Sequence, residues 1–271
     1  MCYDISFQVN IKQLTDYFPD LVFDSQMEME FGMISHIQGV SVWAPHPIIY
    51  TNRDDLKPHC KLMEWSAIEF YRKEEPDMKT RNGRLNIRAE RILDDKSSYW
   101  YKIRNRRCLI PVSGAYDHRK IEKKGWKKKV PYHIRPIDQV IFFIPGLYSV
   151  AEIVDKTTGE LQKRWTFGLI TRHAPEGHIM RDIHNEGENK WRMPLFLPFE
   201  MSKEFLSTEL DTNEVRYREI LNHLMTNEEL NYYTTDTIRT SKPREDGKQK
   251  HEPKIWEGLP ELGLCNPEIL E

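Results

Sequence analysis

Alternating hydrophobic and polar residues open the chain. Tyr3, Ile5 and Phe7 are each followed by a polar residue, and this period of two predicts a strand that begins almost at the first residue. The side chain at position 2 would therefore be anchored at the edge of a sheet. A short helix is predicted next, over residues 11–18.

Most of the remaining chain has the short alternating runs of a β-rich protein. Further strands are predicted at residues 31–42, 47–51, 84–89, 107–111, 131–134, 140–144, 147–154 and 164–171. Turns are predicted at Gly125, at Gly146 and over residues 156–159. Strands joined by short turns pair antiparallel, so we expect a mainly antiparallel sheet or barrel.

Helical spacing appears in the last third of the chain, over residues 199–206 and 212–225. In the second segment Val215, Ile220, Leu221 and Leu224 would share one face. Amphipathic helices beside a sheet pack on its outside, so the expected fold class is mixed α/β, rich in β-structure, with peripheral helices.

The composition changes after Thr240, where charged and turn-forming residues dominate. Such a segment has too little apolar surface to order itself, although Ile255, Trp256 and Leu259 offer points where it can dock. We therefore predict a single catalytic domain over residues 1–240 and a C-terminal tail over residues 241–271, partly disordered or docked.

Composition narrows the possible functions. The 271 residues are 39% hydrophobic and 30% charged, which suits one large globular domain. No run is long enough to cross a bilayer and the first residues do not resemble a secretory signal, so we expect a cytoplasmic protein. The four cysteines are too far apart for a CxxC pair, which argues against a zinc site or a disulfide framework. No metal or cofactor is expected.

Local charge is more informative than the net charge of −2. Arg104, Arg106 and Arg107 form one basic cluster, and residues 119–129 form another in which Trp126 lies among lysines. Cations beside an aromatic ring suit single-stranded nucleic acid. The alternative is a solvated hairpin tip, because lysine-rich turns are common on protein surfaces.

Cys2 offers unusual chemistry if Met1 is removed, because an amine and a thiol then lie on adjacent carbons. Their pKa values, about 8 and about 8.5, leave each with a reactive fraction at neutral pH. With an aldehyde the amine forms a Schiff base, and the thiol closes a five-membered thiazolidine on the same carbon. The alternative is that Cys2 is only a small hydrophobic residue at the start of a strand.

Three later segments carry polar groups that could serve such chemistry. Asn86, Arg88 and Glu90 alternate along a predicted strand and would share one face. The apolar run from Cys108 is expected to end in a glycine turn that presents Asp117 and His118. His184 and Arg192 lie on either side of a polar loop.

Taken together and in order, these segments resemble the SOS-response-associated peptidase (SRAP) family of abasic-site-crosslinking proteins. The shared elements are Met-Cys at the start, Leu-Met-x-Trp ending at Trp65, Asn-x-Arg-x-Glu from Asn86, Cys-Leu-Ile-Pro-x-x-Gly-x-Tyr from Cys108, and a histidine followed by Arg-Met-Pro, here His184 and Arg192. The family usually has glutamate and tryptophan where this chain has Asp117 and His118.

The resemblance implies a barrel-like, mainly antiparallel SRAP fold and a catalytic group. Cys2, exposed by removal of Met1, would form the thiazolidine crosslink with abasic sites in single-stranded DNA, through lyase-type Schiff-base chemistry. Asn86 would orient the N-terminal residue, Asp117 would help to open the sugar ring and His184 would move protons. The protein would act as a monomer in the DNA damage response and associate with the nucleoid when bound to DNA.

The resemblance also implies a basic groove for the DNA strand. Arg88 and Arg192 would hold phosphates there, and Trp65 would lie against a base or shape the groove. The cluster from Arg104 to Arg107 would add further phosphate contacts.

Two other functions remain open. An N-terminal cysteine can be the nucleophile of an amide hydrolase or peptidase that acts on a substrate other than DNA, with the amine as general base. A DNA-binding module without chemistry would instead keep its function when Cys2 is replaced. Only the resemblance to the SRAP family explains the order of the motifs from Cys2 to Pro194.

Overall fold

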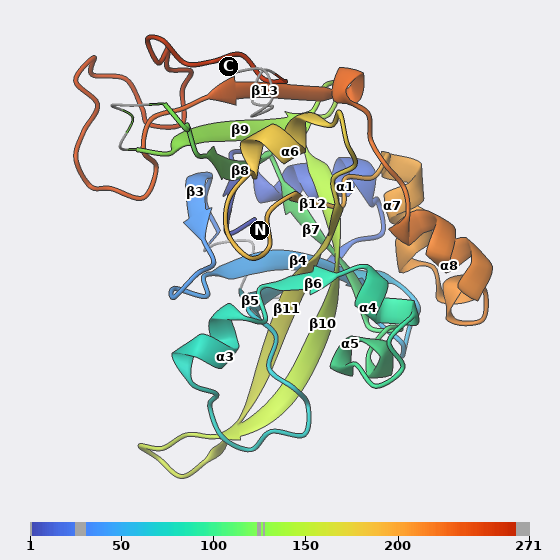
Figure 1. The fold of residues 1–271 in the computed structure, drawn as a ribbon. Helices are drawn as coiled ribbons and strands as arrows, with labels where there is room; N and C mark the ends of the chain where they lie inside the picture. Colours follow the sequence, from blue (N-terminus) through green and yellow to red (C-terminus); the bar gives the residue numbers. More distant parts are fainter. Residues whose placement is uncertain (1, 25–30, 124–125, 127, 264–271) are drawn as a thin grey trace.

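Two sheets and a set of short peripheral helices make up the protein (Figure 1). The structure is a computed structural model and describes residues 2–24, 31–123, 126 and 128–263. The first sheet has the strand order β13-β9-β8-β1-β3, and the second has the order β12-β11-β10-β7-β4-β5-β2. An additional pairing of β11 with β5 closes the second sheet into a barrel of five strands, and β6 is added to it through β11.

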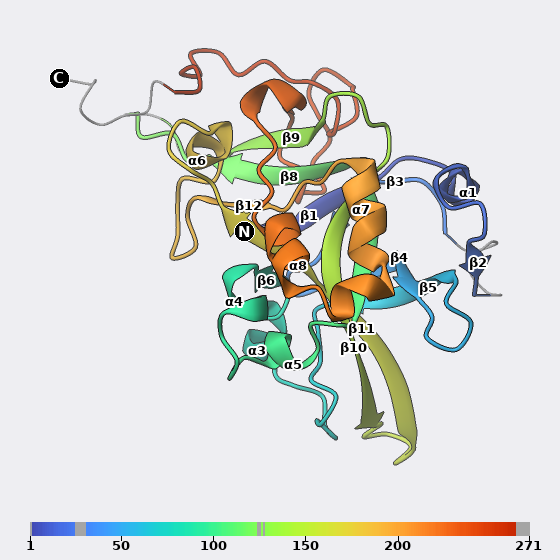
Figure 2. The same ribbon diagram turned by 90° about the vertical axis from the view of Figure 1, so that its right-hand side faces the viewer.

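The strands differ greatly in length. They are β1 (Asp4–Phe7), β2 (Val22–Phe23), β3 (Ile34–Gln38), β4 (Pro45–Thr51), β5 (Pro58–Trp65), β6 (Asn86–Arg88), β7 (Arg107–Val112), β8 (Gly114–Arg119), β9 (Val130–Pro136), β10 (Phe142–Val154), β11 (Leu161–His173), β12 (Arg192–Pro194) and β13 (Leu230–Thr234). The long pair β10 and β11 extends beyond the barrel as a hairpin, at the opposite end of the molecule from the segment that follows β13 (Figures 1 and 2).

The α-helices are short and lie around the sheets. They are α1 (Leu14–Tyr17), α3 (Met78–Asn82), α4 (Glu90–Leu93), α5 (Tyr99–Lys102), α6 (Ile179–Ile183), α7 (Phe199–Leu206) and α8 (Glu214–Leu221). Helix α7 packs on β7 and β10 and buries Phe205 and Leu206 there. Every residue of β7 is therefore buried, because one face of the strand lines the barrel and the other lies under a helix.

The expected fold class is confirmed: the structure is a β-rich mixed fold with a barrel and peripheral helices. Most pairings are antiparallel, but β5 and β6 run parallel to β11, and β2 runs parallel to β5. Strands β5 and β13 and helices α3 to α5 were not expected, because none of them has a clear period in the sequence.

Four local predictions were wrong. Gly146 lies inside β10 instead of a turn. A glycine is needed there because a Cβ would lie 2.6 Å from the Gly168 carbonyl oxygen on the neighbouring strand. Asp117 lies in the strand β8 rather than on a turn. Glu90 begins α4 and so does not share a strand face with Asn86. Val215 is 73% exposed, since the buried face of α8 is carried by other residues. Gly125 lies outside the described residues.

The segment after β13 is held by many polar contacts. The Trp256 indole donates to the Thr235 carbonyl at 3.0 Å and its ring lies 6.2 Å from that of Trp126, whereas Ile255 is exposed. The Arg244 guanidinium donates to the Gln249 and Glu252 carbonyls. The division into a domain over residues 1–240 and a tail remains a prediction.

Candidate functional site

Cys2 lies just before β1, in a position that the neighbouring strand β8 defines. Asp4 pairs with Tyr116 in an antiparallel register, which brings Asp117 beside the start of β1. The Cys2 side chain is 1% exposed, and its thiol donates to the Asp4 carbonyl at 3.4 Å. Burial raises the pKa of the Cys2 thiol, and the nearby carboxylates of Asp117 and Asp4 raise it further. Met1, whose removal was predicted, lies outside the described residues.

Asn86 fixes the main chain of Cys2. Its side-chain amide nitrogen donates to the Cys2 carbonyl at 3.0 Å, across 84 residues of sequence. The parallel pairing of β6 with β11 holds Asn86 opposite Leu169. The Asn86 side-chain oxygen is buried and has no hydrogen-bond partner among the described residues.

Asp117 and His184 complete the group around Cys2. One Asp117 carboxylate oxygen accepts from the His118 amide at 2.8 Å, whereas the other is buried without a partner in the described part of the chain. His184 follows α6, and its Nδ1 lies 2.8 Å from the Arg192 carbonyl. The Arg192 amide nitrogen lies 3.3 Å from the same Nδ1, so the main chain of Arg192 holds this ring nitrogen in place. Burial lowers the pKa of His184 and the Asp117 carboxylate opposes this shift, so the imidazole is neutral at pH 7.

These four residues, Cys2, Asn86, Asp117 and His184, are called the Cys2 group below. Two of their buried polar atoms have no partner among the described residues, although most buried polar atoms in proteins are hydrogen-bonded. A substrate that brings donors into the site would satisfy both. Within the described residues no cluster of His, Cys, Asp and Glu has the arrangement of a metal site.

The arginines named by the sequence lie in different surroundings. Arg88 is exposed and donates to the Asn189 side chain at 2.6 Å, in the loop between α6 and β12. Arg192 is buried, and both of its terminal nitrogens donate to the Glu90 carboxylate at 3.1 Å. In this structure Arg88 therefore offers a cation to solvent, whereas the Arg192 guanidinium is already neutralised.

The basic cluster at the start of β7 is separate from the Cys2 group in its contacts. Arg104 lies over the Tyr101 ring and Arg106 over the Phe70 ring, at 4.1 and 5.6 Å from the centroids. Arg107 is buried and donates to the Phe205 carbonyl and the Asp211 carboxylate, each at 2.7 Å. Arg107 thus joins β7 to the helices beside it.

Trp65 is packed in the protein interior, next to Gly39. Its side chain is 0% exposed, its indole donates to the Leu85 carbonyl at 3.0 Å, and its ring stacks on Phe167. Gly39 lies so close that a Cβ would be 2.7 Å from the Trp65 ring, and the Gly39 amide donates to the Tyr3 carbonyl at 2.8 Å. Trp65 can therefore shape the site through Gly39 but has no surface on which a base could stack.

Sequence reasoning missed a second buried group, beside Cys2. The Asp4 carboxylate is 1% exposed and lies 2.7 Å from His36 Nε2. Arg239 Nε donates to its two oxygens at 2.9 and 3.1 Å. Burial by itself would raise the pKa of Asp4, but the hydrogen bonds from His36 and Arg239 lower it. No motif joins these residues, and Arg239 is 235 positions away, so only the fold brings them together.

Comparison with known proteins identifies the family of this chain. Residues 1–238 match the family described as SOS response associated peptidase (SRAP). The abasic site processing protein YoqW of Bacillus subtilis is 30% identical over 145 residues, which is 54% of this chain and 56% of the relative. The abasic site processing protein YMR114C of Saccharomyces cerevisiae is 28% identical over 42% of this chain and 27% of the relative. The match thus spans about half the length of the first relative and about a quarter of the second.

Solved structures share the fold. A protein from Bacteroides thetaiotaomicron has a TM-score of 0.69 at 22% identity, with 93% of this chain and 97% of that one covered. A protein from Bordetella bronchiseptica has a TM-score of 0.65 at 15% identity, with 87% and 100% covered. Among the described residues, no helix is long and apolar enough to cross a bilayer. Since the family match covers most of the chain, this protein belongs to the SOS response associated peptidase (SRAP) family.

Proposed function

We propose that this protein recognises abasic sites in single-stranded DNA and forms a covalent thiazolidine link to them through Cys2. The observation that carries the proposal is the hydrogen bond from Asn86 to the Cys2 carbonyl, within a buried group that also contains Asp117 and His184. Relatives with 28–30% identity are named abasic site processing proteins, which supports the choice of substrate.

The reaction needs no oxidant and no cofactor. An abasic sugar in its ring-opened form has an aldehyde at C1′. The Cys2 amine, free once Met1 is removed, attacks this carbon, and loss of one water gives an imine. The thiol sulfur then adds to the same carbon while its proton passes to the imine nitrogen, which closes the ring. The product has the mass of protein plus DNA minus one water.

The surroundings of Cys2 favour attack by the amine before the thiol. Burial raises the thiol pKa, so the thiolate is scarce at neutral pH, and the thiol reacts once the imine is held beside it. Asn86 would keep the Cys2 main chain in place during both steps. The low fraction of thiolate also disfavours the alternative of a cysteine amide hydrolase, in which the sulfur must attack first.

Proton transfers are assigned to Asp117 and His184. Opening the sugar ring requires a proton at the ring oxygen and removal of one from the C1′ hydroxyl. Asp117 has a carboxylate oxygen without a partner in the described chain, and it is assigned to the ring-opening step. His184, neutral at pH 7, is assigned to the proton that leaves the attacking amine.

Arg88, exposed beside the loop that follows α6, is assigned to a phosphate of the bound strand. Arg192 would position His184 through its main chain and would reach a phosphate only after leaving Glu90. Arg104 and Arg106 would contact DNA farther from the abasic site.

The test uses single strands with and without one abasic site. Protein that begins with Cys2 should give a band that survives denaturation only with the abasic strand, and intact mass should show the loss of one water. Protein that keeps Met1, or carries an N-terminal tag, should give no stable band, because its amine is locked in a peptide bond. An equally fast and stable adduct from the tagged protein would overturn the amine mechanism. Hydrolysis of small amides without any DNA adduct would favour the amide hydrolase.

A further inference from the structure

A hollow with many cationic side chains lies beside the Cys2 group. It has a volume of about 560 Å³ and is lined by the segment after β13 together with His118, Lys128 and Lys129. Its lysines and arginine are Lys128, Lys129, Arg239, Lys242 and Lys254, and its carboxylates are Asp236 and Glu245. Three of these cations have a carboxylate partner, since Arg239 pairs with Asp4, Lys129 with Glu186 and Lys254 with Asp236. Lys128 and the exposed Lys242 therefore carry most of the positive charge that is open to an anionic ligand.

Arg239 and His118 connect this hollow to the Cys2 group. Arg239 lines the hollow while it binds the Asp4 carboxylate, and the Asp4 carbonyl accepts from the Cys2 thiol. His118 lines the hollow and is the residue after Asp117. The hollow is therefore next to the Cys2 group and is joined to it through Arg239 and His118.

The wall of the hollow is built by hydrogen bonds between the main chain and side chains. Lys254 donates from its side chain to Asp236 at 2.8 Å and from its amide to the Thr234 carbonyl at 2.8 Å. The Asp236 amide donates in turn to the Lys250 carbonyl at 3.1 Å. Lys254 therefore supports the wall. Lys242 is 78% exposed and lies 3.4 Å from the exposed Glu245 carboxylate, and Lys128 makes no ion pair with any described residue.

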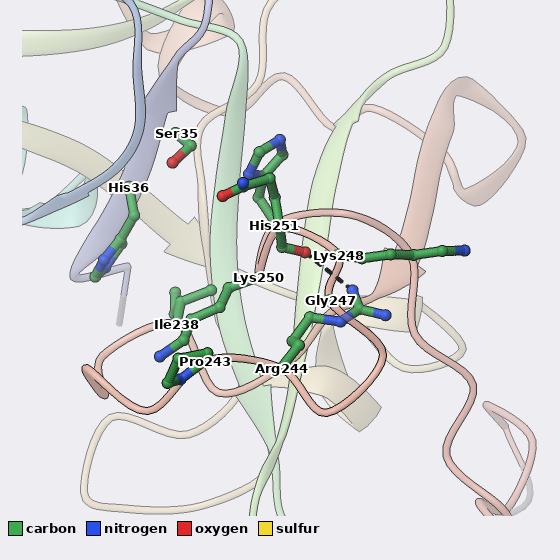
Figure 3. Close-up of a pocket in the computed structure, with 10 residues that line it drawn as sticks. Ser35, His36, Ile238, Pro243, Arg244, Gly247, Lys248, Lys250 and His251 are labelled. Carbon is green, nitrogen blue, oxygen red and sulfur yellow. Dashed lines mark hydrogen bonds between the residues drawn. The ribbon is translucent and has the colours of Figure 1, made fainter.

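A second hollow, of about 320 Å³, shares Ile238 and Pro243 with the first (Figure 3). Its central cation, Arg244, is fully engaged: it binds the Asp246 carboxylate and, as the dashed line in Figure 3 marks, donates to a main-chain carbonyl of the same segment. Its Lys250 donates to Thr240. These contacts stabilise the segment, and the exposed Lys248, which also lines this hollow, makes no ion pair with any described residue.

The first hollow is lined by residues on both sides of position 238, where the family match ends. Lys128 and Lys129 lie within the match, and Arg239, Lys242 and Lys254 follow it. We propose that the first hollow is a phosphate-binding subsite, and that it holds the backbone of the same DNA strand next to the abasic site. The identity of the strand rests on the proposed function; the anionic ligand rests on the hollow itself.

The test compares two charge reversals in the hollow with a matched one elsewhere. The variant Lys128→Glu/Lys242→Glu changes two exposed side chains that support no other described element. The control is Lys156→Glu, in the exposed turn of the β10–β11 hairpin at the far end of the molecule. The first probe is a fluorescent single strand without an abasic site, so binding is measured separately from adduct formation.

We expect the double variant to bind this strand about tenfold more weakly at low salt, and the slope of log affinity against log salt to fall by about two. The control should keep the wild-type slope. Equal slopes and affinities for the double variant and the control would overturn the subsite, even if the wild-type protein forms adducts. Absence of adducts from wild-type protein would instead overturn the proposed function.

A second measurement places the subsite relative to the lesion. With a long abasic strand below saturation, the double variant should form adducts about tenfold more slowly than wild type. With a short abasic strand, which ends before the hollow, the two should react equally fast. An equal loss of rate with both strands would mean that the substitutions disturb the Cys2 group, and it would overturn the proposal.

Discussion

The Cys2 group is built from buried side chains and the ionic cluster beside β11 from buried and half-buried ones, and the two use their hydrogen bonds differently. In the ionic cluster Arg81 and Arg164 lie between the carboxylates of Glu64 and Glu75, and Arg81 Nε also donates to Ser66 at 3.1 Å. No buried side-chain atom of these five residues lacks a partner in the described chain. In the Cys2 group Asn86 and Asp117 each leave an oxygen without one.

This difference separates a structural role from a functional one. The ionic cluster has the higher density of charge, yet all of its charge is used to hold β5, α3 and β11 together. The Cys2 group has fewer charges, and its unused hydrogen-bonding capacity is free for a substrate. The two groups therefore differ in how fully their polar atoms are paired within the described chain, although buried atoms without such a partner also occur at His46, Arg107, His133 and His223.

The largest effect is expected when the Cys2 sulfur, the reactive atom of the Cys2 group, is removed. Cys2→Ala should abolish the stable adduct, since the ring cannot close without sulfur, and should leave noncovalent binding of single strands within a few-fold. Cys60→Ala is the matched control, because Cys60 is equally buried but lies in β5. Both variants are assayed by denaturing gel with an abasic strand. A stable adduct from the Cys2→Ala protein would refute the role of the thiol.

Asp117→Asn should lower the rate of adduct formation without lowering the stability of the fold. It removes a proton-transfer group, which costs about 10²–10⁴-fold in the single-turnover rate of adduct formation. It should leave the free energy of unfolding unchanged or slightly higher, because a buried carboxylate with an unpartnered oxygen becomes a neutral amide of the same shape. Rates and urea midpoints of the same preparations test this. A wild-type rate would remove Asp117 from the mechanism.

Arg81→Met should show the opposite behaviour. It leaves the Glu64 and Glu75 carboxylates short of a partner and should destabilise the protein by about 3 kcal/mol, while folded molecules form adducts at the wild-type rate. Arg218→Met, which breaks two exposed ion pairs, should cost no more than about 1 kcal/mol. Urea unfolding measures both. Equal costs would mean that burial of the cluster contributes nothing.

Asp4→Asn tests the group that joins the Cys2 group to the C-terminal segment. The folded state lowers the Asp4 pKa, so its contribution to stability is present above the unfolded value of about 4 and is lost as the pH falls through the lower folded value. The variant should be about 2 kcal/mol less stable at pH 7, and this deficit should shrink below about pH 4. Urea midpoints at a series of pH values give the comparison. A deficit that does not change with pH would argue against the charged contacts with His36 and Arg239.

Some elements could be predicted from the sequence because their cause is local. Helix α7 has the bounds that its apolar spacing indicated, and β1 and β7 begin where alternating or apolar runs begin. Strand β5 was missed because it is buried irregularly on both faces, which removes the period of two. Gly146 was assigned to a turn because a glycine required by a close neighbouring strand looks the same in sequence as a glycine required by a turn.

The sequence by itself determined the membership in a family and the β-rich fold class, because an ordered series of short motifs is a property of the chain alone. Only the tertiary structure decided which polar groups are used and which are free. Arg192 and Arg107 are neutralised by Glu90 and Asp211, and Trp65 is covered, whereas Arg239 reaches Asp4 from the other end of the chain. The reason is physical: hydrogen-bonding partners and burial are set by distances in space, and these contacts join residues that are tens to hundreds of positions apart.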